Sequence, residues 1–371
     1  PYADDEFVRM WVADMEFATP PEVCQAIKDR VDKRIFGYSQ ILNDSYYNSF
    51  AAWCKDKYDW TFPREQLVFS PGIIPALYEL VGDLTAPDEK VLVPSPSYGY
   101  FLHAAEFNHR ELVCSPLKDD GGYFTIDFED LERKAADPKV KLLIWSNPHN
   151  PTGRMWTEEE TRKVCEIVEK YQLWFISDEI HCDLIRQGRR HLPTAKVMPD
   201  YPRLITCMSA SKTFNMAGLM FSNIIVRDEK VRALMAEHDK LFGCVNPISV
   251  TASQAAYDRG DAWLQALRAY LDENFVFVSA FLKEHLPQAV FRIPEATYLA
   301  WVDLSGCLGD VEDLPMFFAN EAGVLLEGGD GLFVGNAKGF VRLNLAMPRS
   351  IIEKGLKRME EAIRRHQAAR A

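Results

Sequence analysis

The sequence predicts an α/β protein with two parts: a large domain around a doubly wound, mostly parallel sheet, and a smaller α+β domain built from both chain ends. Two observations predict the large sheet. From about residue 64 to residue 276, helical stretches alternate with short apolar runs, as in a parallel sheet covered by helices. Several of these runs are near-continuous Val, Leu and Ile, which is typical of strands buried on both faces.

The elements of the large domain follow from these patterns in chain order. The predicted strands are "KVLVPS", "VKLLIWSN", "LWFISDE", "RLITCMSAS" and "SNIIVRD", and the clearest helices are "PALYELVGDL" and "EEETRKVCEIVEKY". Ligands of such sheets bind beyond the carboxyl ends of the parallel strands. We therefore expect one site where polar motifs directly follow the apolar runs, namely at "PSPSYGY", "SNPHNPTGR", "SDEIHCD" and "SASK".

The smaller domain is predicted from a change of pattern near the end of the chain. A long helix is expected around "GDAWLQALRAYLDENFVFVSAFLKEHL". After it, "VFRIPEATYLAWVDL" and "FVRLNLAMP" predict strands, and "IIEKGLKRMEEAIRRHQAA" predicts a terminal amphipathic helix. We assign residues 41–276 to the large domain, and residues 1–40 together with 277–371 to the small one.

Composition excludes several classes of function. The chain has 371 residues, of which 47% are hydrophobic and 26% charged, as in ordinary globular proteins. A net charge of −12 argues against nucleic-acid or anionic-membrane partners. Its eight cysteines form no C-x-x-C pair, so neither a metal site nor a disulfide framework is indicated. No apolar run is long enough to span a membrane, and the acidic start is unlike a signal peptide. A cytoplasmic protein is expected.

Lys212 is the first candidate site residue. It follows Ser209, Ala210 and Ser211, and apolar stretches flank it on both sides. A lysine that bonds covalently to a carbonyl compound needs such a setting, because desolvation lowers its pKa and frees the amine. The serine hydroxyls and backbone N–H groups suit a phosphate next to that amine. The alternative is a solvated loop lysine.

Asp178 and Arg342 are charged residues at positions where charge is costly. Asp178 ends the strand "LWFIS", where it either caps a following helix or holds a heterocyclic nitrogen in its protonated form. Arg342 has apolar neighbours in "GFVRLNLAMP". A buried arginine needs an anion, either a ligand carboxylate held by its two-pronged guanidinium or an internal salt bridge.

Three weaker signals accompany them. "SNPHNPTGR" is rich in turn formers, so it is either only a tight loop or a loop from which Asn150 hydrogen-bonds a ligand. "SPGIIPALYEL" enters a helix, where the N–H groups of Ile73 and Ile74 are available to a phosphate. Tyr98 follows a strand, where it either stacks on a flat ring or packs in a core or interface.

Taken together, the order of these motifs resembles the fold-type I enzymes that depend on pyridoxal 5′-phosphate (PLP), within the class I/II aminotransferase family. The resemblance covers essentially the whole chain. "WVADMEFATPPEV", "FGYS", "SDEIHCDL" and "SKTFNMAGL" are similar to one branch in particular, the C–S lyases of the cystathionine β-lyase type.

The resemblance implies a role for each residue. Lys212 would bind PLP covalently, Asp178 would pair with the pyridine nitrogen, Asn150 would bond the ring hydroxyl and Tyr98 would stack on the ring. The phosphate would be held by Ser209, Ser211, Ile73 and Ile74, and by Tyr38 from the neighbouring subunit of a homodimer. Arg342 would bind the carboxylate of an amino-acid substrate, with the backbone of Ala13 near it.

Two positions depart from the general aminotransferase pattern. His181 stands where those enzymes usually have a tyrosine, and Met220 stands where an arginine is common. Both departures resemble the lyase branch and change the contacts of the cofactor ring and phosphate. His181 as an ordinary core histidine is the alternative.

The resemblance implies β-elimination from L-cystathionine or a related S-substituted cysteine, giving a thiol, pyruvate and ammonia. An aminotransferase using the same residues is the first alternative. A regulatory protein that retains the PLP fold is the second. The pocket for the substrate side chain is left open, with Tyr100, Phe214, Met216 and Tyr298 as possible lining residues.

Overall fold

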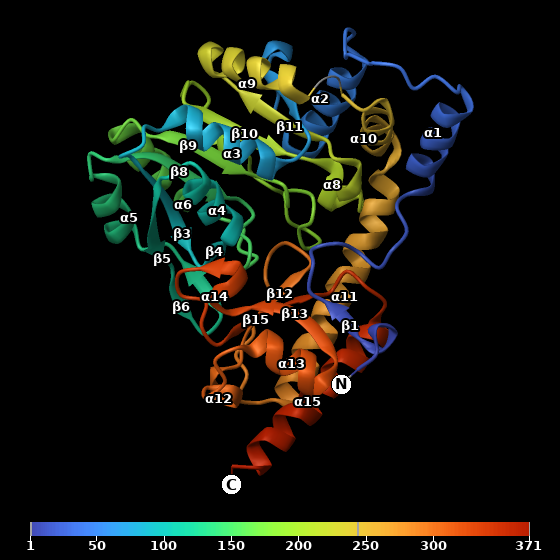
Figure 1. Ribbon diagram of the computed structural model, residues 1–371, viewed down its shortest axis with the longest axis vertical. Helices are drawn as coiled ribbons and strands as arrows, with labels where there is room; N and C mark the ends of the chain where they lie inside the picture. Colours follow the sequence, from blue (N-terminus) through green and yellow to red (C-terminus); the bar gives the residue numbers. More distant parts are fainter. Residues whose placement is uncertain (1, 243–244, 371) are drawn as a thin grey trace.

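Figure 1 shows the computed structural model, which describes residues 2–242 and 245–370. A seven-stranded sheet forms the larger part. Its strand order is β2 (Leu67–Ser70), β11 (Ser222–Val226), β10 (Leu204–Met208), β9 (Trp174–Asp178), β8 (Val140–Ser146), β3 (Lys90–Ser95) and β5 (Glu111–Pro116). The strands from β10 to β5 run parallel, whereas β11 is antiparallel to both of its neighbours. The predicted mostly parallel sheet is therefore confirmed.

Helices cover both faces of this sheet, which explains why its strands are apolar on both sides. On β8, Leu142 and Ile144 pack in one apolar cluster while Leu143 and Trp145 pack in another. The first face is covered by α3 (Ile73–Leu84), α4 (Gly99–Phe107) and α9 (Glu229–Phe242). The second face is covered by helices that include α2 (Ser45–Tyr58), α5 (Phe128–Ala135), α6 (Glu158–Lys170) and α10 (Pro247–Arg259). This is the doubly wound arrangement.

A second sheet brings the two ends of the chain together. Its order is β1 (Val8–Met10), β13 (Val324–Gly328), β15 (Phe340–Asn344) and β12 (Leu299–Asp303). The N-terminal β1 runs parallel to β13, and the other pairs are antiparallel. The helices α13 (Leu314–Ala322) and α15 (Arg349–Ala368) pack on one face of it. Figure 1 shows this unit below the large sheet.

Two helices bear on the predicted division into domains. The helix α1 (Pro21–Asp32) contacts α10 of the large unit. The long helix α11 (Asp261–His285) runs from the large unit down to the small one, past residue 276 (Figure 1). The predicted boundaries at residues 40 and 276 stay a prediction.

Part of one predicted strand is wrong. In "VFRIPEATYLAWVDL" only the residues of β12 join the sheet, and the preceding stretch makes isolated bridges at Val290 and Ala296. Pro294 has no N–H to give to a ladder, and Thr297 adopts a positive φ of 69°. The apolar pattern does not reveal either constraint.

The remaining elements are short. They are η1 (Asp4–Glu6), η2 (Arg64–Gln66), β4 (Ser97–Tyr98), β6 (Lys118–Asp120), β7 (Tyr123–Thr125), α7 (Thr194–Val197), α8 (Ala210–Thr213), η3 (Ala217–Leu219), α12 (Ser305–Leu308), α14 (Gly329–Leu332) and β14 (Phe333–Val334). The strands β4 and β14 pair with each other and so link the large unit to the small one. Within the described residues, no helix has the length and apolar character needed to cross a membrane.

Candidate functional site

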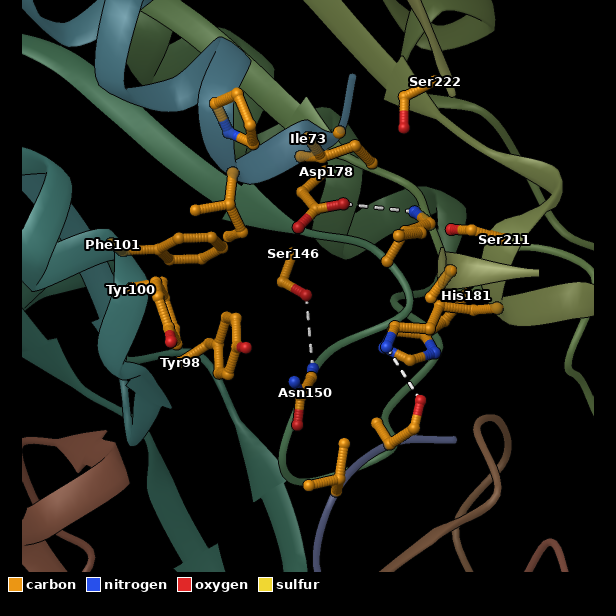
Figure 2. A pocket seen from close by; sticks show the side chains of 18 of the residues that line it. Ile73, Tyr98, Tyr100, Phe101, Ser146, Asn150, Asp178, His181, Ser211 and Ser222 are labelled. Carbon is orange, nitrogen blue, oxygen red and sulfur yellow. Dashed lines mark hydrogen bonds between the residues drawn. The ribbon is translucent and has the colours of Figure 1, made fainter. Parts of the chain in front are cut away.

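A cavity of about 410 Å³ lies at the carboxyl ends of β8 and β9, beside the turn after β10. Both sheets line it, because Asp178 comes from the end of β9 and Arg342 from the middle of β15. All the predicted site residues line this cavity except Ser209 and Tyr38. Figure 2 shows Tyr98, Asn150, Asp178 and His181 around it. Motifs that are far apart in the sequence therefore meet in one place, as the strand topology predicts.

Lys212 enters the cavity from the short helix α8, which follows β10. The hydroxyl of Ser209 caps this helix by accepting the N–H of Ser211 at 3.1 Å. The Lys212 ammonium donates to the carbonyl of Ala13 at 2.7 Å. Burial lowers the pKa of Lys212, and the charge of Asp14 opposes that shift. The solvated-loop alternative does not fit this part-buried lysine, whose amine loses its proton more readily than an exposed one.

The carbonyl of Ala13 is held in place by its surroundings. Asn215 hydrogen-bonds the backbone of Met15 and the carbonyl of Phe17, and the amide of Asn344 lies between the carbonyls of Val12 and Asp14. These contacts fix the N-terminal segment across the cavity. The two asparagines escaped the sequence analysis, because nothing in their local patterns shows that they face the same segment.

Asp178 is a buried carboxylate without a cationic partner. Its Oδ1 accepts the N–H of Ile180 at 3.2 Å, and no hydrogen bond to its other oxygen is found among the described residues. Burial raises the pKa of Asp178 to about 7. The residues after Asp178 form turns, so the helix-cap alternative is wrong. A protonated ring nitrogen is the kind of partner that such a carboxylate lacks.

The ligand-free protein should become more stable when Asp178 is replaced by asparagine. The folded pKa of about 7 lies above the ordinary carboxyl value of about 3.9, so wild-type stability falls as pH rises between these two values. At about pH 8 the gain in the free energy of unfolding should reach up to about 4 kcal/mol, and near pH 4 it should vanish. Urea unfolding across this pH range measures it.

Asp258→Asn is the matched control for this experiment, because Asp258 is exposed. It should leave the pH dependence of stability as in the wild type. If Asp178→Asn and Asp258→Asn gave the same pH profile, Asp178 would not be a destabilising buried charge.

His181 lines the same cavity and is 3% exposed. Burial lowers its pKa to about 3, and the positive charges of Lys212 and Arg342 add to this effect. The ring is therefore neutral at physiological pH. Its Nδ1 has no hydrogen-bond partner among the described residues. A core histidine normally satisfies both ring nitrogens, so the geometry favours a ligand-facing role over the core alternative.

One wall of the cavity offers donors to an anion. The helix α3 begins at Ile73 with no side chain capping it, so the N–H groups of Ile73 and Ile74 lack intrahelical partners. The hydroxyls of Ser211 and Ser222 also line the cavity. Ser222 was missed in the sequence, because its strand "SNIIVRD" reads simply as a buried strand.

Ser209, which is expected to bind the phosphate, lies next to the cavity. It is absent from the cavity lining, and its hydroxyl lies 2.9 Å from both the Ser211 hydroxyl and the Phe221 carbonyl. Ser209 therefore hydrogen-bonds Ser211 without lining the cavity itself. Met220, where an arginine is common, lines the cavity and leaves this wall without a guanidinium.

Asn150 and Tyr98 lie on the side of the cavity next to Arg342. The N–H of Asn150 donates to the Ser146 hydroxyl at 3.2 Å, and the Asn150 side-chain oxygen lies 3.4 Å from an Arg342 nitrogen. Tyr98 stands on β4, 5.2 Å from the ring of Tyr100. Figure 2 shows both tyrosine rings on the same side of the cavity.

Of the four residues expected to line the pocket for the substrate side chain, three do not line the cavity. Phe214, Met216 and Tyr298 are buried in the core, and only Tyr100 lines the cavity. The hydroxyl of Tyr298 donates to the Ala13 carbonyl at 2.7 Å, which helps to hold that carbonyl near Lys212.

Arg342 is a buried cation without a counter-ion. It is 2% exposed, and within the described residues no carboxylate lies within 4.0 Å of its guanidinium. One Nη donates to the Trp11 carbonyl at 3.0 Å, while Nε has no partner among the described residues. The internal salt bridge considered above is therefore not formed. A buried guanidinium with an unsatisfied donor fits a ligand carboxylate.

Tyr38 lies outside the cavity. Its side chain is 99% exposed, in the segment between α1 and α2. Ile35, Phe36 and Leu42 in the same segment are also exposed. The described residues place no three His, Cys, Asp or Glu side chains so that they could hold a metal ion.

Comparison with known proteins extends these observations. The family model "Aminotransferase class I and II" matches residues 6–359. "Cystathionine beta-lyase PatB" of Bacillus subtilis is 38% identical over 95% of this chain and 92% of its own length. "Protein MalY" of Escherichia coli is 32% identical over 95% and 90%. The structure of the PLP-bound C–S lyase from Staphylococcus hominis matches with a TM-score of 0.94 and 49% identity, covering 96% of this chain and 92% of that one.

Proposed function

Because this chain belongs to the aminotransferase class I and II family, we propose that it is a PLP-dependent C–S lyase. The reaction is β-elimination from L-cystathionine or a related S-substituted cysteine. One observation carries the proposal: the part-buried Lys212 and the buried Asp178 and Arg342, which form no ion pair within the described residues, line a single cavity. The lyase relatives and the C–S lyase structure supply the reaction type.

The side chains fit PLP. Asp178 offers an unpaired buried carboxylate to a pyridine nitrogen, and Lys212 offers an amine whose pKa is lowered by burial. The free N–H groups of Ile73 and Ile74, with the hydroxyl of Ser211, suit a phosphate. When bound, PLP supplies an electron-withdrawing ring that stabilises negative charge developing at the substrate Cα.

Lys212 binds the cofactor in the resting enzyme and acts on the substrate afterwards. With PLP and substrate bound, the Nζ of Lys212 would serve as the base that takes the proton from the substrate Cα, because it is the base expected nearest to that atom. Asp178 would hold the ring nitrogen in its protonated form. Asn150 would bond the ring hydroxyl and Tyr98 would pack on the ring, while the lowered pKa of His181 keeps that side chain neutral near Lys212.

Arg342 orients the substrate. Its guanidinium binds the α-carboxylate, and the backbone around Ala13 borders that position. With amine and carboxylate both held, the Cα–H bond and the Cβ–S bond have fixed directions. Loss of the Cα proton and departure of the thiolate from Cβ then lead, with one water, to the thiol, pyruvate and ammonia.

We also propose a cytoplasmic homodimer with active sites at the interface. The exposed apolar segment around Tyr38 supports an interface there, since Tyr38 would reach the partner's phosphate site only across it. The free cysteines of the described residues and the net charge of −12 agree with a reducing compartment.

The decisive experiment is pyruvate release from L-cystathionine by the purified protein with PLP and no keto acid. Steady release over many turnovers is expected, because elimination needs no second substrate. If instead no pyruvate formed but an added keto acid was converted to its amino acid, the aminotransferase would replace the lyase. If neither reaction occurred although PLP was bound, the regulatory alternative would stand.

A further inference from the structure

Glu327 is a charged residue of the cavity that the proposed reaction does not use. It lies on β13, whose residues alternate between the two faces of the small sheet: Val324 and Leu326 pack in the core below. Glu327 points to the opposite face and lines the cavity. The sequence "VLLEG" alone does not show which face of this strand meets a ligand.

This carboxylate has no partner within the described residues. It is half-buried, and neither a hydrogen bond nor an ion pair to it is formed there. It stands directly opposite Arg342 in the antiparallel register of β13 and β15, yet the guanidinium donates to Trp11 and Asn150 instead. Burial raises the pKa of Glu327, and Arg342 counteracts that shift without making contact.

The surrounding charges place Glu327 near Tyr98 and Arg342. Both Glu327 and Arg342 act on the pKa of Tyr98, so both charges lie near that ring. The charges that act on Lys212 are those of Asp14, Arg342 and Asp178. The charge of Arg342 thus acts on the pKa of both Tyr98 and Lys212. Glu327 lines the same cavity as Tyr98, Tyr100 and Leu332.

The position of the substrate follows from these charges. A substrate whose amine lies at Lys212 and whose α-carboxylate binds Arg342 neutralises the charge of the guanidinium. Glu327 then remains as a half-buried negative charge that faces the rest of the ligand, which is costly unless a cation approaches it. An ammonium group satisfies the carboxylate, and the neighbouring tyrosine rings also favour a cation.

We propose that Glu327 is a specificity-determining residue that favours substrates with a second ammonium group on the leaving thiol, as in L-cystathionine. This inference rests on the proposed lyase function and names the substrate class of that site. Glu327 would favour amino-acid thioethers with two ammonium groups over simple S-alkyl cysteines, which have one.

The test compares two substrates that differ only in that group. S-(3-carboxypropyl)-L-cysteine has the chain length and the distal carboxylate of L-cystathionine but lacks the distal ammonium. The measured quantity is the ratio of kcat/KM for L-cystathionine to kcat/KM for this analogue, in the wild type and in Glu327→Gln. We expect the wild-type ratio to exceed one, and the substitution to lower the ratio by about 10- to 100-fold, as for loss of a charged hydrogen bond.

The outcomes separate the possible roles. If Glu327→Gln lowered both kcat/KM values by the same factor, Glu327 would act through Arg342 on every substrate and the inference would be wrong. A wild-type ratio near one would overturn it as well. If the wild type released pyruvate from neither compound, the lyase function itself would fail, and the inference with it. Glu327→Asp should recover part of the ratio, because it restores the charge at a shorter reach.

Discussion

Pyruvate release from L-cystathionine is expected to fall by about 10³-fold or more when Lys212 is replaced by alanine. The substitution removes both the amine proposed to bind the cofactor and the proposed base at the substrate Cα. The Ala13 carbonyl loses the hydrogen bond that it accepts from Lys212 at 2.7 Å but keeps the one that it accepts from Tyr298. The surrounding structure should therefore persist. Steady-state pyruvate assays with saturating PLP measure the loss.

A second readout separates catalysis from folding. PLP should be removed from Lys212→Ala by dialysis, whereas it should stay on the wild type, and the far-UV circular dichroism of the two should coincide. Lys163→Ala is the matched control, since Lys163 is a surface lysine paired with Glu159 on α6. Activity of Lys212→Ala equal to that of Lys163→Ala would refute the role assigned to Lys212.

Replacement of Arg342 by glutamine should lower kcat/KM for L-cystathionine by about 10²- to 10³-fold, mainly through a higher KM. Truncating one partner of a buried charge pair costs about 2–5 kcal/mol, or roughly 30- to 4,000-fold, and the expected loss lies inside that range. The α-carboxylate is held before and during the reaction, so kcat should change less than KM. Initial rates over a wide substrate range measure both constants.

Arg342→Lys is the informative comparison. It keeps the charge but loses the two-pronged geometry, so its kcat/KM should lie between those of the wild type and Arg342→Gln. If Arg342→Gln left KM unchanged and lowered only kcat, the guanidinium would not be the carboxylate site. It would then act on the reacting atoms or on the position of Asn150, 3.4 Å away.

Much of this site was predictable because its residues belong to motifs at the ends of apolar strands. Asp178 is the last residue of β9 and Lys212 lies on the short helix α8 after β10, and parallel pairing of these strands brings both to one edge of the sheet. Arg342 was recognisable as a charge inside an apolar strand. For these residues, local pattern and strand topology together determine the location.

Other features depend on contacts between distant segments and were missed. Glu327 meets the cavity only because β13 pairs with β15. Ser209 is expected to bind the phosphate, and the sequence does not show that its hydroxyl also caps α8. The asparagines that hold the N-terminal segment are ordinary residues in sequence. Hydrogen bonds of this kind are visible only once the fold is known.

The threading of the N-terminal segment across the cavity has a consequence for biosynthesis. Residues 11–17 leave the ribosome well before Asn215 and Asn344, which hold them. The parallel sheet can form around β3, β8, β9 and β10 while β15 is still untranslated. Until Asn344 arrives, the nascent chain has Lys212 and Asp178 in place but neither Arg342 nor a completed wall. Under the proposed roles, the residues for cofactor binding are therefore synthesised before the one for substrate recognition.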